Sequence, residues 1–150
     1  MQTIAKPSIA RILNRLLVLH QRSLPMFVTY ASPWAEARDA EALEALRHLV
    51  EDQQRLAGQI TDYMFERRWR VDSGEFPLEF TGLHDVSLEY LWPMLIESQQ
   101  RNIREIQTCI SGLGSDPYAR ALAEESLGSA KGHLETLEEI AQTLKSKKVQ

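Results

Sequence analysis

The chain is poor in the residues that mark disulfide-rich, loop-rich and membrane-spanning proteins. Its 150 residues include one cysteine, six prolines and seven glycines, and aromatic residues make up only 7% of the sequence. One cysteine cannot form an internal disulfide, and so little proline and glycine argues against a loop-rich or disordered chain. The sequence has no apolar stretch of bilayer length, and residues 1–8 lack the pattern of a secretory signal. These absences predict one folded domain, residues 1–150, in the cytoplasm.

Long runs of one charge are absent as well. The net charge is −4, and acidic and basic residues are interspersed. Without a broad positive field, neither nucleic acid nor a membrane is expected as a partner. The two basic clusters, residues 67–70 and 145–148, lie at the expected ends of helices, where cations stabilise the negative pole of the helix dipole. We interpret them in this way because neither cluster has the glycine-rich loop or stacking aromatics of a phosphate-binding site.

Helix start and stop signals divide the chain into four parts. Ser32 followed by Pro33, and Asp116 followed by Pro117, are typical of an N-cap with proline in the first turn, and Thr81 is a further expected cap. Between these signals, apolar residues recur at alternating steps of three and four, as on one face of a helix. The predicted helices span about 8–31, 33–70, 82–113 and 117–146. Four amphipathic helices of this length predict an all-α four-helix bundle.

Two prolines fall inside these predicted helices. Pro25 lies in the first helix and Pro93 in the third. Each should free a carbonyl one turn earlier and bend its helix.

The connections between the predicted helices differ in length. The first and last are a few residues long, which favours two antiparallel hairpins. Residues 71–82 could extend to about 40 Å, enough to run back along the bundle and place the second and third helices parallel. In this segment Phe76, Leu78 and Phe80 alternate with other residues, as expected for an extended chain lying across a groove. A simple up-down-up-down bundle with a long loop is the alternative.

Each apolar stripe is interrupted near its middle by a side chain that can form hydrogen bonds. We expect the four to lie at similar depth in one core and to pair with each other or with trapped water. They are His20, Gln53, Gln99 and His133. Small residues surround His133, so a small ligand could bind beside it.

Two helical hairpins joined by a long crossover, with polar residues at mid-bundle, resemble the ferritin-like superfamily. The halves correspond internally, since 33 residues separate His20 from Gln53 and 34 separate Gln99 from His133. Members that bind two iron or manganese ions use a carboxylate from each of two helices and a Glu-x-x-His pair from each of the others. Here only His133 matches a ligand type, and neutral amides cannot neutralise two cations. The resemblance therefore implies a bundle with a degenerate metal site, no cofactor, and a binding or association role rather than catalysis.

Two other functions follow from other placements of these residues. If the second and third helices were rotated, Glu51 and Glu97 would join His20 and His133 and could bind one ion of iron, zinc or copper, as in a metal-dependent oxidoreductase. That rotation would expose large apolar side chains, at a cost of about 1.5 to 3 kcal/mol each. A histidine phosphotransfer module ranks third, because it would need His133 to be exposed near Lys131.

The aromatic residues favour association of the chain with itself. Trp34, Trp69, Phe76 and Phe80 fall at helix ends and on the long connection. A monomer would have difficulty burying all of them. We therefore expect a homodimer.

Overall fold

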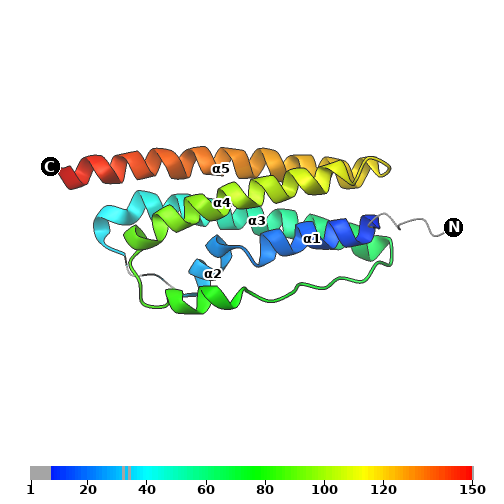
Figure 1. Ribbon diagram of the computed structural model, residues 1–150, viewed down its shortest axis with the longest axis horizontal. Helices are drawn as coiled ribbons and strands as arrows, with labels where there is room; N and C mark the ends of the chain where they lie inside the picture. The colour runs from blue at the N-terminus through cyan, green and yellow to red at the C-terminus, as the bar shows by residue number, and fades with distance from the viewer. Residues whose placement is uncertain (1–7, 32, 34, 150) are drawn as a thin grey trace.

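The long helices of the protein lie along one long axis (Figure 1). The computed structural model describes residues 8–31, 33 and 35–149. This part of the chain contains no strand, so the predicted all-α class is confirmed. No helix among the described residues is long and apolar enough to cross a membrane. The elements in chain order are α1 (Ile9–Gln21), α2 (Leu24–Ala31), the short 3₁₀ helix η1 (Ala37–Asp39), α3 (Ala40–Glu66), the 3₁₀ helix η2 (Leu78–Leu83), α4 (Leu88–Ser111) and α5 (Pro117–Val149).

The directions of the long helices depend on the segment between α3 and α4. Figure 1 shows α1 and α5 running one way and α3 and α4 the other. After α3 the chain returns along the length of the molecule as an extended segment, and η2 precedes the start of α4. Because of this return, α3 and α4 point in the same direction, as the length of the connection allows.

The predicted first helix, 8–31, is wrong as a continuous element: it is two helices, α1 and α2. The chain leaves α1 after Gln21, and Ser23 begins the next helix by accepting a hydrogen bond from the backbone N–H of Met26 (3.2 Å). Pro25 therefore lies in the first turn of α2, where a missing N–H breaks no helical hydrogen bond. The proline separates two helices instead of bending one. Pro93, in contrast, lies within α4, which continues through it.

The second predicted helix, 33–70, is too long at both ends. Pro33 is not helical, and the expected cap Ser32 lies outside the described residues. The carboxylate of Asp39 accepts from the backbone N–H of Glu36 (2.8 Å) and closes a turn ahead of α3. The helix then ends at Glu66.

The third predicted helix, 82–113, begins six residues too early. The hydroxyl of Thr81, its expected cap, donates instead to the carbonyl of Leu78 within η2 (2.6 Å). Ser87 is the N-cap, and its hydroxyl accepts from the backbone N–H of Tyr90 (3.1 Å). Two hydroxyl residues compete for this role, and local 3₁₀ structure decides between them.

The start of α5 is the predicted one. Asp116 accepts from the backbone N–H of Ala119 (3.1 Å) and also from the hydroxyl of Tyr63 on α3 (2.6 Å). Burial and this hydrogen bond raise the pKa of Tyr63. One carboxylate thus caps α5 and fixes it to α3.

The aromatic residues of the long connection pack against α2. Rings of Phe76 and Phe80 lie 5.4 and 5.5 Å from the ring of Phe27, while Leu78 points to solvent and is 86% exposed. The predicted extended chain is correct up to residue 77. Beyond it the segment forms η2, and the ring centroids of Phe76 and Phe80, four residues apart, lie 6.4 Å from each other.

The argument for a homodimer loses its basis in this packing. Trp69 stacks edge-to-face on Tyr63 (5.9 Å between ring centroids), and the two phenylalanines of the connection contact α2. Trp34 lies outside the described residues. Because three of the four aromatic side chains have partners in their own chain, the homodimer stays a prediction without this support.

Candidate functional site

The apolar core is divided into two clusters, and polar side chains lie between them on every long helix. One cluster joins leucines of α1 to the second half of α3, the second half of α4 and the first half of α5. The other joins α2 to the first half of α3, the start of α4 and the later part of α5. Between them along the chain fall the four side chains predicted to form a layer. Three are almost fully buried: His20 (4% exposed), Gln53 (6%) and Gln99 (2%).

The break between α1 and α2 is held by a hydrogen bond across the core. The hydroxyl of Ser23 donates to the side-chain oxygen of Gln53 on α3 (2.8 Å). The same hydroxyl caps α2, so one group starts a helix and satisfies a buried amide. Through this bond, Gln53 on α3 holds Ser23 at the junction of α1 and α2.

His20 is the one histidine buried in this layer. Its Nε2 lies 2.9 Å from the hydroxyl of Ser126 on α5. Burial lowers the pKa of His20 from its ordinary 6.5 to about 4. The imidazole is therefore neutral near pH 7 and bridges α1 and α5 without a charge.

Gln99 leaves one of its polar atoms without a partner. Its side-chain N–H donates to the carbonyl of Ala130 on α5 (3.1 Å), but its oxygen, Oε1, is buried and accepts from no described residue. Nearby, Asn102 Nδ2 lies 3.5 Å from the carbonyl of Leu19, in the last turn of α1, where carbonyls lack helical donors. The layer thus supplies a donor to a carbonyl at the end of α1, and it contains one buried acceptor, Gln99 Oε1, that has no donor among the described residues.

These groups surround a small cavity with a volume of about 10 Å³. That is close to the least space that holds one water molecule. A water there would supply the missing donor to Gln99. None of the described residues that line the cavity carries a carboxylate. The polar lining side chains are His20, Gln53, Gln99, Asn102, Ser126 and Ser129.

His133, the fourth predicted member, is directed elsewhere. Its Nε2 lies 2.6 Å from the carboxylate of Asp52 on α3, and its side chain is 17% exposed. Arg55 lies 3.7 Å from the same carboxylate and 2.9 Å from that of Glu125 on α5. His133 thus contacts a row of charged side chains at the α3–α5 surface and does not line the cavity. A phosphotransfer role at Nε2 would require this nitrogen to leave the carboxylate of Asp52.

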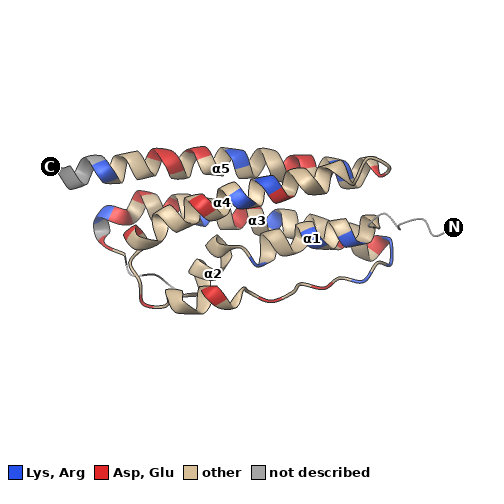
Figure 2. Cartoon of the chain, in the orientation of Figure 1, with Lys and Arg blue, Asp and Glu red and all other residues tan. Residues whose placement is uncertain are grey.

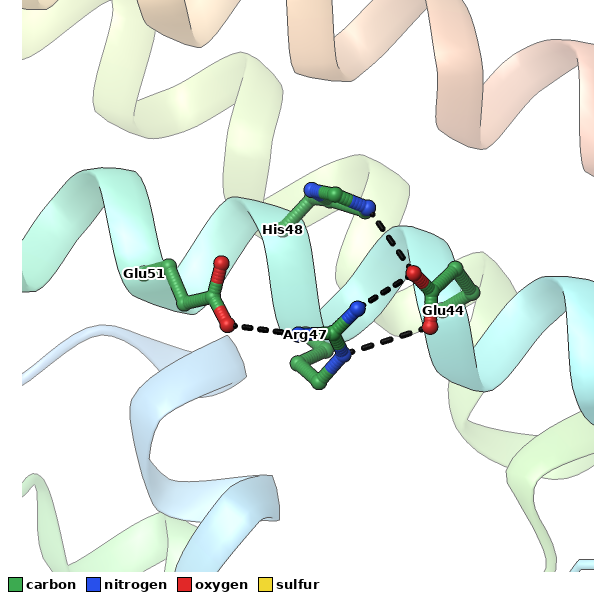
Figure 3. Close-up of polar contacts among 4 residues, drawn as sticks. All are labelled: Glu44, Arg47, His48 and Glu51. Carbon is green, nitrogen blue, oxygen red and sulfur yellow. Dashed lines mark hydrogen bonds and ion pairs between the residues drawn. The ribbon is translucent and has the colours of Figure 1, made fainter.

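The structure does not bring the proposed metal ligands Glu51 and Glu97 to the histidines. Glu51 is exposed and bonds to Arg47 (2.8 Å), one turn away on the same face of α3 (Figure 3). Arg47 is held by Glu44 as well, which also accepts from His48 (3.0 Å). Glu97 is exposed and pairs with Arg101. The rotated arrangement of helices is therefore not adopted, and Val50 and Ile103 remain buried.

The donor set does not fit a two-metal site. Two divalent ions need several anionic oxygens, whereas the groups around the cavity are an imidazole, amides and hydroxyls, all neutral near pH 7. A space of about 10 Å³ is also too small for two ions and their ligands. Over the described residues, no group of three His, Cys, Asp or Glu is placed to hold a metal ion.

Comparisons with protein-family models, curated proteins and solved structures find no match. The residues of the chain alone therefore carry the functional argument.

Several residues of the layer were not assigned to it from the sequence. Ser23 and Ser126 lie on the apolar stripes of the predicted helices, Ser23 one step after His20 and Ser126 two steps before His133. Their positions could be predicted, but their hydrogen-bond partners could not. Asn102 and Asp52 lie beside the stripes, and no signal in the sequence distinguishes them from solvated residues. Their partners depend on the rotation of each helix and on the break after α1.

Proposed function

We propose that the protein is a non-catalytic binding or association module, built on a ferritin-like four-helix bundle that lacks an intact two-metal site. One observation carries this proposal. The polar layer at the middle of the molecule consists of neutral groups that bond to each other and to backbone carbonyls around a space for one water. Such a layer fixes helix register and the α1–α2 break. Interaction with other molecules then falls to the outer surface.

The arrangement of the chain supports the ferritin-like part of the proposal. If α1 and α2 are counted together, two helical pairs are joined by a connection that returns along the molecule, and α3 and α4 run in parallel (Figure 1). The polar side chains lie between the two apolar clusters on each helix. In a bundle that binds two metals, this is the level of the ligands.

The proposal is tested by metal analysis of the purified protein. The chain is expressed in medium supplemented with iron, zinc or copper, and its metal content is measured by plasma mass spectrometry. We expect well below one ion per chain for each metal, because the layer offers no anionic ligand.

Two variants and a control make the result decisive. Stoichiometric metal that is lost in His20→Ala and His133→Ala, but retained in His48→Ala, would overturn the proposal. His48 is an exposed histidine on α3, so it controls for adventitious surface binding.

A further inference from the structure

Three arginine side chains line one pocket where α1 begins and α3 ends. The pocket has a volume of about 640 Å³ and includes Arg11 of α1 together with Arg68 and Arg70, which follow α3. Figure 2 shows basic positions on both segments at this end of the molecule. The sequence predicted that the cluster after α3 would stabilise the helix end. In the structure, Arg67 contacts the hydroxyl and ring of Tyr63 on α3. Arg68 and Arg70 line the pocket instead.

These arginines differ from most others in the protein because none of them forms an ion pair with a described residue. All twelve arginines lie in the described part of the chain. Seven of them form ion pairs with carboxylates, and Arg22 donates to backbone carbonyls. Of the four that form neither contact with a described residue, three line this pocket, and the fourth is Arg104. In a chain with a net charge of −4, this is a local concentration of unneutralised positive charge.

The backbone at Arg68 adds to the argument. Arg68 has a φ of 60°, and the N–H of Trp69 donates to the carbonyl of Met64 (2.9 Å), which is the pattern of a Schellman turn at the end of α3. Glycine is preferred at the left-handed position of this turn, because a side chain there is strained. An arginine at such a position is expected where its side chain has a use.

The walls of the pocket are fixed before any ligand binds. Asn14 and Asp72 exchange two hydrogen bonds, from Asn14 Nδ2 to the Asp72 carbonyl (2.9 Å) and from the Asp72 N–H to Asn14 Oδ1 (2.8 Å). They tie the segment that carries Arg70 to α1. On the other side Trp69 packs on Tyr63. A preorganised site loses less entropy on binding.

The charges around the pocket favour an anion. The first turn of α1 contains no acidic residue, so the positive pole of that helix adds to the field of the arginines. Asp72 is the one carboxylate among the described lining residues, and its Oδ1 accepts from the backbone N–H of Gly74 (3.0 Å). Three guanidinium groups opposed by one engaged carboxylate leave an excess of about two positive charges, which matches a phosphate dianion.

We propose that this pocket binds the phosphate group of a phosphorylated small molecule, with Arg11, Arg68 and Arg70 as its ligands. The inference rests on the proposed binding role and names a ligand class for it. None of these three arginines lines the cavity of the polar layer, and no residue of that cavity lines this pocket. Metal analysis can therefore fail while phosphate binding succeeds, and the reverse.

The test measures binding of inorganic pyrophosphate to the full chain by isothermal titration calorimetry at constant ionic strength. Arg68→Gly and Arg70→Gln should each weaken binding about tenfold or more, since each removes charge-assisted hydrogen bonds. Arg104→Gln, which changes an exposed and unpaired arginine of α4, should bind like the original chain. Equal affinity in all four proteins, or no heat beyond that of sodium chloride, would overturn the proposal.

Arg68→Gly also separates a ligand-binding role from a structural one. Because glycine relieves the strain at φ 60°, this variant should unfold at a higher temperature than the original chain in phosphate-free buffer, while it binds pyrophosphate less well. An arginine kept for stability would give a lower unfolding temperature instead. Such a result would contradict the assignment of Arg68.

Two further arms identify the source of the phosphate. Phosphatidylcholine vesicles that contain phosphatidic acid are sedimented with the protein, with and without pyrophosphate. Binding that pyrophosphate reverses supports the pocket and assigns a lipid phosphomonoester to it, whereas calorimetric binding without sedimentation supports a soluble phosphate compound. Binding to single-stranded RNA in the absence of any pyrophosphate affinity would overturn the proposal.

Discussion

Between pH 7 and pH 4, burial of His20 is expected to cost the protein roughly 3 kcal/mol of its free energy of unfolding. The pKa of His20 is lowered from 6.5 in the unfolded chain to about 4 in the folded one. Below pH 6.5 the unfolded chain therefore binds a proton that the folded chain does not bind until about pH 4. Stability falls through this window as pH falls, and above pH 6.5 the contribution is constant.

A urea-denaturation series at pH 7, 6, 5 and 4 measures this loss. The matched control is His20→Gln, which keeps a polar side chain near Ser126 but cannot be protonated. The original chain should lose roughly 3 kcal/mol more than the variant between the ends of the series. Parallel profiles for the two proteins would contradict a buried neutral imidazole.

Trp92→Ala is expected to destabilise the protein by about 3 to 5 kcal/mol, the usual cost of a large cavity in a packed core. Trp92 is 2% exposed and is the largest fully buried side chain of the apolar cluster that joins α2, α3 and α4. Its indole N–H also donates to the carbonyl of Leu137 (2.8 Å), which fixes α4 against α5. The loss is measured as the change in the free energy of unfolding in urea.

Two further variants separate the contribution of packing to stability from that of the hydrogen bond. Trp92→Phe keeps an aromatic ring and loses the donor, so it should cost about 1 to 2 kcal/mol. Tyr90→Ala, two residues away and 62% exposed, should change stability by less than about 0.5 kcal/mol. A cost below about 1 kcal/mol for Trp92→Ala would mean that α4 does not pack on α5 as described.

The bonds from Trp92 and Gln99 to α5 share one register. The two donors are seven residues apart on α4, and their acceptors, Leu137 and Ala130, are seven apart on α5 in the opposite order. The Trp92–Leu137 bond lies in the apolar cluster that contains α2, and the Gln99–Ala130 bond lies beside the cavity. A slip of either helix would break both, which is how the polar layer specifies the packing.

Much of the helical organisation could be predicted from local signals. Asp116 with Pro117 correctly predicted the start of α5. The break at Ser23 was missed because the apolar pattern continues across it, and Pro25 was interpreted as a bend. Whether a proline bends or divides a helix depends on the contacts formed around it, and here the hydroxyl of Ser23 donates to Gln53, which is distant in sequence.

The candidate site was predictable only as a set of positions. The stripes correctly placed His20, Gln53 and Gln99 in the core, because burial follows from helical periodicity. His133 lies on the same kind of stripe, yet its ring reaches Asp52, which no stripe includes. A rotation of a few tens of degrees decides this outcome, and periodicity does not resolve it.

The account as a whole depends on a closed and uncharged layer between the two apolar clusters. Titration of the His20 ring by two-dimensional ¹H–¹⁵N NMR, assigned with the His20→Gln variant, tests this most directly. We expect the folded protein to show a pKa for His20 near 4. A ring that titrates near 6.5 would contradict the account, since it would mean that His20 meets solvent or an anion instead of the neutral groups of the cavity.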